Sequence, residues 1–436
     1  MSESADPAGN IKRVRYARSA HRARSHDSAH AQTPAPSREE LSKHADVPAG
    51  EAEMVASDHS LRELIAHLRD SKTFAYDSEF IGELTYLPKL CLIQVATTSR
   101  IALIDPLAGL DLMPFWELLG DDSVEKVVHA GDQDVEPVGR HLGRPAANVF
   151  DTQLAAGFIG MAYPVALLKL VHEIIGIKLG KGLTFSHWDQ RPLSAMQLRY
   201  AADDVRYLPA LRTKIGQKLD AMGHMHWARE EFDNLCDVKL YQFDPETHYL
   251  RVRGATSLSG QQLAVLKELT VWRDAVARAH DVPPRAFLKD ELLVDLSRNP
   301  VKDVQKLGRV RGLPRPVEAA HGAEIVAATL RGLSTSPAHL PPVRPEPTPT
   351  ERFRADALWA AAQCLCIGQS LDPALVTSRQ EIGDFYRYLC RGGKEPNIGL
   401  LKGWRRSAVG DPLREMVSEG KAITLDWSDG SLRAQR

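Results

Sequence analysis

The expected order of strands and helices changes along this chain, and that order restricts its fold. Between Thr73 and Leu107 three strand-like segments follow one another through short connections: TFAYDSEF, PKLCLIQVA and RIALIDPL. Short connections favour antiparallel neighbours, so these segments predict a three-stranded meander. Strand-like and helical segments then alternate as far as Asp151, and helices continue to about Leu219. The pattern predicts a mixed sheet that is flanked by helices.

Two helical blocks follow the sheet region. Both blocks place apolar residues at helical spacing. The segment between them contains six prolines, which is typical of a stiff linker, and we expect a cut near Pro341 to leave the sheet domain folded. The expected parts are a sheet domain at 55–250, a helical domain at 256–333, the Pro-rich linker at 334–350 and a second helical domain at 351–430.

Residues 1–54 show neither a helical nor a strand period, and we expect a disordered extension. Its basic stretch from Lys12 to Arg24 is interpreted as a solvated tail, and an arm that binds nucleic acid is the alternative. Lys and Arg total 55 against 56 Asp and Glu, so any binding of nucleic acid must use local basic patches.

Membrane and secretory classes are not expected. No apolar run approaches the roughly 20 residues of a membrane span, and the N-terminus lacks the apolar core of a secretory signal. The five cysteines are scattered and match no zinc-site spacing. These features predict a reduced, cytoplasmic protein without structural zinc.

Asp77 and Glu79 stand two apart on an expected strand, so their side chains lie on one face of the sheet. Two neighbouring carboxylates repel each other unless a cation separates them, and hard divalent ions such as Mg²⁺ prefer such oxygen ligands. Alone, the pair is more often a solvated strand face. Asp134, after the strand KVVHA, is by itself more often a helix N-terminal residue.

Tyr200 and Asp204 stand four apart in LRYAADDVRYL, an expected helix, and therefore lie about 40° apart around its axis. Asp203 points about 100° away from Asp204. Arg199 or Arg206 is its expected ion-pair partner. A lone Tyr and Asp at this spacing would more often be structural.

In this order, however, the acidic residues and the tyrosine resemble the DEDD exonucleases. The flanks DSEF, TYLPKLCLIQVA, ALIDPL, KVVHAGDQD, FDTQLAA and LRYAADDVRYL are similar to the ribonuclease D family over roughly Ser57 to Tyr249. One variant of the class has His five residues before the last Asp. Here Arg199 holds that position and Tyr200 follows it, which fits the tyrosine variant. KGLTFSHWDQRPLS departs from the family, which often has an acidic residue where His187 precedes Trp188.

The resemblance implies a ribonuclease H-like mixed sheet with two small all-α domains after it. It implies a 3′–5′ exoribonuclease that releases 5′-mononucleotides from RNA with a free 3′ end, usually tRNA precursors and other small structured RNAs. It implies two divalent metal ions, Mg²⁺ or Mn²⁺. Asp77 would bridge both ions, Glu79 and Asp204 would complete the first site, Asp134 would hold the second, and Tyr200 would orient the attacking water. No obligate protein partner is evident.

The helical blocks carry resemblances of their own. LKELTVWRDAVARAHDVPPRAFLKDELLVDLSRNP, with LGRVRGLP after it, resembles the HRDC domain. The last block, with LDPALVTSRQEI and LLKGWRR, is similar to the second helical domain of the ribonuclease D family. Contacts with the nucleic acid are expected from Lys181, Ser186, Lys306, Arg309, Arg311, Lys402, Arg405 and Arg406.

Two alternatives stay open. One is a DNA-directed 3′–5′ exonuclease of the same superfamily, because no residue of the pattern is identified as the reader of the ribose 2′-hydroxyl. The other is a non-catalytic RNA-binding protein on the same fold. The presence of all four acidic residues together with Tyr200 favours an enzyme over this second alternative.

Overall fold

The computed structural model describes residues 37–82, 84–180, 187–336 and 347–420, together with residue 422 and the segments 424–428 and 431–435. The described chain forms two compact units. The sheet unit, as we call it, is the described part of Gln32–Glu79, Leu90–Tyr241 and Glu346–Arg436. The helical unit is the described part of Phe80–Lys89 and Gln242–Pro345.

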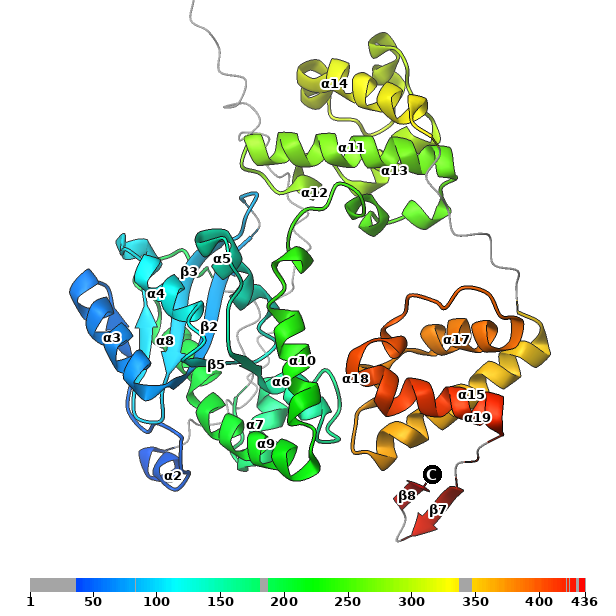
Figure 1. Ribbon diagram of the computed structural model, residues 1–436. Coiled ribbons are helices and arrows are strands. Elements are labelled where there is room, and N and C mark those ends of the chain that lie inside the picture. The colour runs from blue at the N-terminus through cyan, green and yellow to red at the C-terminus, as the bar shows by residue number, and fades with distance from the viewer. Residues whose placement is uncertain are drawn as a thin grey trace, which may run out of the picture. The chain divides into compact units, whose positions relative to one another are not determined.

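Within the described residues, six strands form a mixed sheet in the order β1-β4-β3-β2-β5-β6 (Figure 1). β3 and β4 are antiparallel, whereas β1 with β4, β2 with β5, and β5 with β6 are parallel. The predicted mixed sheet is therefore confirmed, and the short β1 was not expected. The strands are β1 Glu53–Val55, β2 Thr73–Ile81, β3 Lys89–Ala96, β4 Ile101–Ile104, β5 Glu125–Val128 and β6 Val149–Asp151.

Helices cover both faces of this sheet. Phe74 and Tyr76 of β2 belong to a core with α3, α4 and α5, whereas Ala75 between them belongs to the core with α6 to α10. Because side chains alternate along a strand, Asp77 and Glu79 share the face of Ala75. The helices are α3 Asp58–Ser71, α4 Met113–Leu119, α5 Asp132–Leu142, α6 Thr152–Gly157, α7 Leu167–Ile175, α8 Ala195–Arg206, α9 Leu208–Met222 and α10 Met225–Leu235.

Of the predicted disordered extension 1–54, residues 1–36 lie outside the described residues, and the rest has a defined structure. From Ser37 it is described, and a short helix, α2 (Arg38–Ser42), precedes β1. Leu41 and Val47 are buried in the core of the sheet unit. Arg206 donates hydrogen bonds to the carbonyls of Pro48, at 2.6 Å, and Gly50, at 2.9 Å. Contacts with residues distant in the sequence give this segment its structure, although its own sequence has no helical or strand period. The prediction of a disordered extension was therefore wrong for residues 37–54.

The last helical block packs into the core of the sheet unit, and residues 337–346 of the expected linker lie outside the described residues. Leu365 and Phe385 lie in the same buried cluster as Phe158 and Leu170. The rings of Phe158 and Trp404 have centroids 4.8 Å apart. The block contains α15 Pro349–Gly368, α16 Pro373–Val376, α17 Arg379–Arg391, α18 Gly403–Arg405 and α19 Asp411–Glu419, and an unexpected hairpin of β7 Thr424–Ser428 and β8 Ser431–Gln435 follows.

The helical unit has its own core around Leu266, Leu269 and Trp272 of α11. It also holds the turn between β2 and β3. There the hydroxyl of Tyr86 donates to Asp274 at 2.6 Å, and Arg278 lies over the tyrosine ring. The helices of this unit are α11 Gly260–Ala279, α12 Pro284–Phe287, α13 Asp290–Arg298 and α14 Arg315–Ser334.

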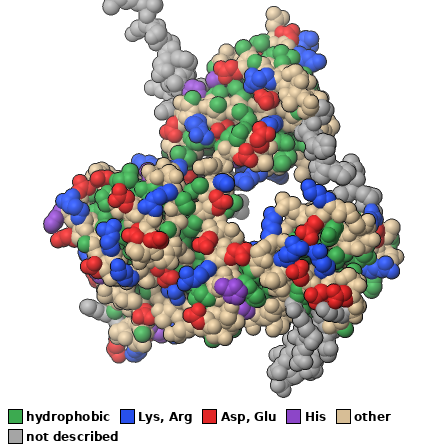
Figure 2. Space-filling model, viewed as in Figure 1, with side chains coloured by type: hydrophobic (Ala, Val, Ile, Leu, Met, Phe, Trp, Pro, Cys, Tyr) green, Lys and Arg blue, Asp and Glu red, His purple; other side chains and the backbone are tan. Residues whose placement is uncertain are grey.

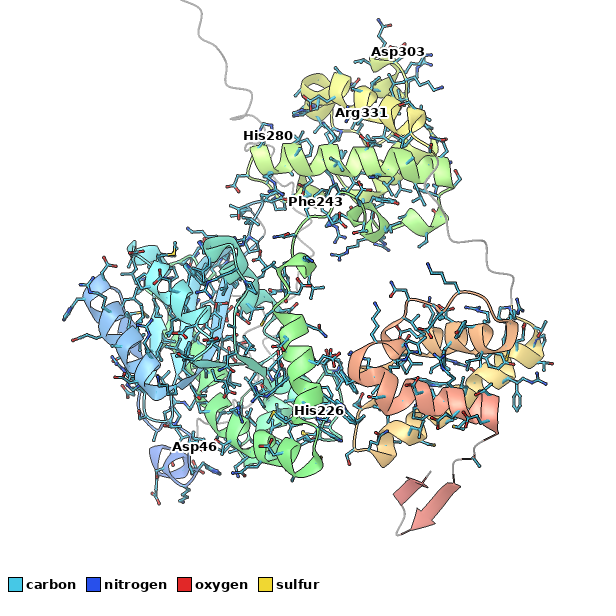
Figure 3. All side chains as sticks on the ribbon, in the orientation of Figure 1. Asp46, His226, Phe243, His280, Asp303 and Arg331 are labelled. Atoms are coloured by element: carbon cyan, nitrogen blue, oxygen red, sulfur yellow. The ribbon has the colours of Figure 1, made fainter. Side chains whose placement is uncertain are left out.

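The surface carries mixed charge. Figure 2 shows basic and acidic side chains interspersed over the visible face, as the balanced composition predicts. Asp303, labelled in Figure 3, accepts a hydrogen bond from the N–H of Gln305 and so begins the short helix Val304–Arg309 of the helical unit. Among the described helices none has both the length and the apolar character that a membrane span requires.

Candidate active site

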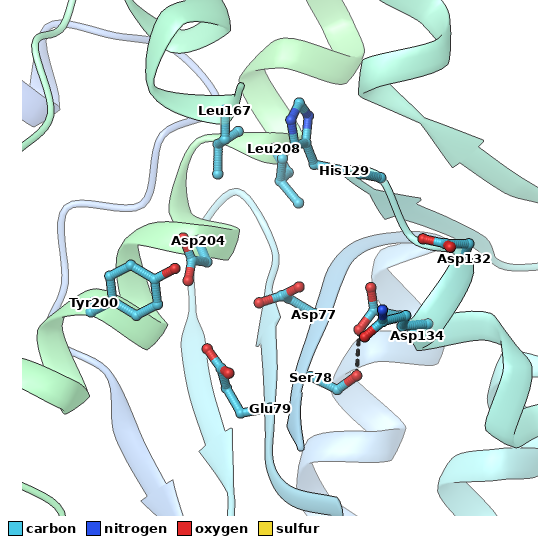
Figure 4. A pocket seen from close by; sticks show the side chains of 12 residues that line it. Asp77, Ser78, Glu79, His129, Asp132, Asp134, Leu167, Tyr200, Asp204 and Leu208 are labelled. Atoms are coloured by element: carbon cyan, nitrogen blue, oxygen red, sulfur yellow. Dashed lines mark hydrogen bonds between the residues drawn. The ribbon is translucent and has the colours of Figure 1, made fainter. Parts of the chain in front are cut away.

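The four predicted acidic residues and Tyr200 line one pocket of about 360 Å³ in the sheet unit (Figure 4). Asp77, Glu79 and Asp204 approach most closely: one carboxylate oxygen from each lies within 4.8 Å of the others. The strand spacing and the helix spacing thus bring three carboxylates from β2 and α8 to one point. No Lys or Arg is among the described residues that line this pocket.

Helix α8 is well defined at its start, and this places Tyr200 and Asp204. Ser194 and Gln197 form a capping box, in which the N–H of Gln197 reaches the Ser194 hydroxyl at 3.2 Å. One turn further on, Tyr200 and Asp204 both face the pocket (Figure 4). Asp203 instead pairs with Arg206 at 3.1 Å and with Arg199 at 3.7 Å, so its predicted ion pair is confirmed.

Asp134 enters the pocket from the first turn of α5, and a tight turn sets its position. Ala130 has a φ of 55°, in the left-handed region that non-glycine residues rarely adopt. A Cβ on Gly131 would come within 2.5 Å of Val128, so only glycine fits there. The N–H of Gly131 donates to Asp151 at 2.9 Å. The sequence HAGD therefore fixes where α5 begins.

The carboxylates raise one another's pKa values. Burial raises the pKa of Asp134 to about 7. Burial and the charge of Asp134 raise the pKa of Glu79 to about 7. Burial, and then neighbouring carboxylates, raise the pKa of Asp77 and of Asp204 well above the usual range. Four half-buried or buried carboxylates without an internal cation cannot all stay ionised, so this donor set fits hard divalent cations.

Tyr200 is held beside the carboxylates and is a poor base. Its ring lies 6.3 Å from that of Trp188, which is buried. Burial and the charge of Asp204 raise the pKa of Tyr200 further above its ordinary value. Its hydroxyl therefore stays protonated at neutral pH and acts through hydrogen bonds.

The pocket has an apolar side as well. Leu167 of α7, Leu208 of α9 and the ring of His129 lie on the opposite side of Asp77 from Glu79 (Figure 4). The two ring nitrogens of His129 are bonded to Thr152, at 2.9 Å, and to the carbonyl of Val165, at 3.1 Å. His129 therefore turns only the face of its ring to a ligand. Sequence reasoning missed these residues, although His129 stands in the quoted motif KVVHAGDQD.

The segment around Trp188 is tied to the sheet by Arg191. Its guanidinium meets both carboxylate oxygens of Asp105, at 2.6 and 2.7 Å, and donates to the carbonyl of Cys91 at 2.7 Å. This ion pair lowers the pKa of Asp105. Arg191 and Asp105 were not predicted as important, but both stand in motifs that the sequence analysis quotes. They hold Trp188 where it contacts Tyr200.

The expected contacts with nucleic acid have different outcomes. Lys181 and Ser186 lie outside the described residues. The side chains of Lys306, Arg309 and Arg311 are exposed on the helical unit, and Lys402 is exposed on the sheet unit.

Arg405 and Arg406 both have acidic partners within the fold. The guanidinium of Arg405 donates hydrogen bonds to the carboxylate of Glu231, at 3.0 Å, and to the carbonyl of Leu375, at 3.0 Å. Arg406 faces Glu395 and Asp411 at 3.3 and 3.4 Å. The basic cluster of the sequence is thus partly neutralised by acidic partners, of which Glu231 is distant along the chain.

Relatives of known identity match most of this chain. A ribonuclease D of Pseudomonas paraeruginosa is 34% identical over 372 residues, which cover 84% of this chain and 98% of the relative. A ribonuclease D of Gluconacetobacter diazotrophicus is 33% identical over 365 residues, which cover 82% of this chain and 91% of the relative. At these lengths both matches include the first helical block.

Family models and solved structures agree with these relatives. The model of a 3′–5′ exonuclease domain matches residues 52–220, and that of the HRDC domain matches residues 262–329. The crystal structure of Escherichia coli RNase D superposes with a TM-score of 0.72 at 27% identity, covering 85% of this chain and 99% of that one. The predicted exonuclease fold and HRDC resemblance are confirmed. The chain belongs to the ribonuclease D family, and it is a 3′–5′ exoribonuclease.

Proposed function

We propose that the four carboxylates of the pocket hold two divalent cations, Mg²⁺ or Mn²⁺, at which the 3′-terminal phosphodiester of an RNA is hydrolysed. The observation that carries this proposal is the convergence of Asp77, Glu79 and Asp204 to within 4.8 Å, with Asp134 close enough to raise their pKa values. When bound, the two cations activate the attacking water and neutralise the charge that develops on the phosphate.

The roles proposed for these residues are the ones that the family resemblance implies. Asp77 lies between Asp134 and the pair of Glu79 and Asp204, so its carboxylate would serve both cations (Figure 4). Glu79 and Asp204 complete one site, and Asp134 belongs to the other. Tyr200 donates its hydroxyl proton to orient the water, and the released product is a 5′-mononucleotide.

The apolar side of the pocket suits the terminal nucleotide. Leu167, Leu208 and the His129 ring offer packing surface next to the acidic groups. Both ring nitrogens of His129 are already bonded, so His129 cannot form a hydrogen bond with the edge of a base. We therefore expect similar rates on all four terminal bases.

The substrates that we propose are structured RNAs such as tRNA precursors. The E. coli protein whose fold this chain shares is an exoribonuclease involved in structured RNA processing. Lys306, Arg309 and Arg311 are exposed on the HRDC domain and are proposed to contact phosphates, together with Lys402. A reducing, cytoplasmic location is part of the proposal, and the five cysteines, all among the described residues and none of them in a disulfide, are consistent with it.

One assay tests this proposal. The protein is incubated with RNA labelled at its 3′ or its 5′ end, with Mg²⁺ or with EDTA. We expect the 3′ label to be released at once as a mononucleotide and the 5′-labelled RNA to shorten stepwise. EDTA should stop both reactions. Activity that persists in EDTA would refute the metal mechanism. Equal degradation of a matched DNA strand would show that the enzyme does not distinguish the sugars.

Tyr200→Phe is expected to lower kcat by about 100-fold, because a reactant displaced by a small distance loses a factor of that order. The substitution keeps the ring that packs near Trp188 and removes only the hydroxyl. Metal affinity, measured by calorimetric titration of Mn²⁺, should not change. A wild-type rate for this variant would remove the tyrosine from the mechanism.

A further inference from the structure

Ser78 has no role in the mechanism so far, although it stands between Asp77 and Glu79. Its side chain points to the opposite side of β2, and its hydroxyl donates to a carboxylate oxygen of Asp134 (Figure 4). Tyr76, two residues earlier, is buried and donates from its hydroxyl to the backbone carbonyl of Asp134 at 3.0 Å. Strand β2 therefore supplies two of the four carboxylates from one face, and from the other face it forms hydrogen bonds with a third residue, Asp134.

The topology explains why Asp134 lies within reach of Ser78. β5 pairs with β2 only over Thr73–Ala75, so beyond Ala75 this edge of β2 has no strand neighbour. The first turn of α5 lies beside this edge. Its N-cap residue is Gly131, which has no side chain to bond the turn, and no side-chain cap is present. The contacts from β2 are thus the ones that tie this turn to the strand with the other carboxylates.

The Ser78 hydroxyl bonds a carboxylate that is repelled by its neighbour. Asp77 and Asp134 line the same pocket, and no Lys or Arg is among its described lining residues, so their carboxylates repel each other when both are ionised. An aspartate with a free rotamer would turn away from such a neighbour. A hydrogen-bond donor on the strand holds it in place, in the way that ligating carboxylates are commonly held by further hydrogen bonds.

We propose that Ser78 is a positioning residue: its hydroxyl keeps the Asp134 carboxylate beside Asp77 and thereby sets the affinity of the second cation site. This inference rests on the proposed role of Asp134 as a ligand. It concerns the Asp134-dependent site and not the one formed by Asp77, Glu79 and Asp204. Loss of the hydroxyl should therefore act on metal dependence and leave RNA affinity almost unchanged.

The test compares Ser78→Ala with Ser78→Thr, which keeps a hydroxyl on a residue suited to strands. Ser78→Ala should raise the Mg²⁺ concentration for half-maximal rate by about 10–100-fold, and excess Mg²⁺ should restore the rate. Calorimetric titration should show one of two binding events weakened. Ser78→Thr should behave as the wild type. Unchanged metal dependence in Ser78→Ala, or a loss that Mg²⁺ does not restore, would overturn the proposal.

Tyr76→Phe is the matched control, because it keeps the buried ring and removes only the hydrogen bond to the Asp134 backbone. Its metal dependence should shift less than that of Ser78→Ala, because the Asp134 carboxylate keeps its bond to Ser78. An equal shift in both variants would mean that α5 moves as a whole and that the Ser78 hydroxyl has no specific part. Asp134→Asn separates the two levels of the argument. If Asp134→Asn retains both binding events, the proposed set of metal ligands is wrong. If Asp134→Asn is defective and Ser78→Ala is normal, only the role of Ser78 is wrong.

Discussion

Asp204→Asn is expected to reduce hydrolysis of RNA to near background at ordinary Mg²⁺ concentrations. Asp204 is one of three residues whose carboxylate oxygens lie within 4.8 Å of one another, and an amide cannot replace the charge that it offers to a cation. Binding of RNA should largely survive, because phosphates are also held by basic side chains and backbone donors. Initial rates on a 3′-ended RNA and filter binding of the same RNA measure the two effects separately.

Asp203→Asn is the matched control on the same helix. Asp203 is the neighbouring residue with the same side chain, but it pairs with Arg206 and Arg199 outside the pocket. We expect near-normal rates from this variant. Loss of activity in Asp203→Asn together with normal activity in Asp204→Asn would show that the assignment of the helix faces is wrong.

Deletion of residues 347–436 is expected to unfold or aggregate the sheet unit, whereas the sequence-based expectation is that a cut near Pro341 leaves the sheet domain folded. The deletion uncovers Phe158, which is fully buried, and Gly157, whose carbonyl accepts a bond from Asp372 at 2.9 Å. Each large apolar side chain contributes roughly 1.5–3 kcal/mol on burial. Several such losses match the whole stability of a typical domain, about 5–15 kcal/mol. Solubility and thermal unfolding measure the effect.

A pair of point variants tests the same interface without deletion. Trp404→Ala should lower the free energy of unfolding by about 3–5 kcal/mol, because it leaves a cavity against Phe158 and frees Glu231 from a hydrogen bond of 2.7 Å. Phe353→Ala is the control, since Phe353 is 75% exposed on α15. A truncated protein that melts like the full chain and stays active would contradict this account.

Short-range geometry made much of the site predictable. Asp77 with Glu79, and Tyr200 with Asp204, are brought together by the periods of a strand and a helix, which any reader of the sequence can apply. The balance of strands and helices likewise predicted a mixed sheet, because connection lengths limit which neighbours can pair. Asp134 could be added only by resemblance to a family, since its own surroundings fit a helix N-terminus equally well.

Contacts between distant residues decided the rest. Ser78 and Asp134 are 56 positions apart, and no local pattern marks the hydroxyl as their link. Arg405 looks like a free basic residue until Glu231, 174 positions away, neutralises it. The Pro-rich segment resembles a boundary between independent domains, but Trp404 beyond it fills the core of the sheet unit. Burial and charge pairing depend on which surfaces come into contact after folding, and those contacts cannot be deduced from the composition along the chain.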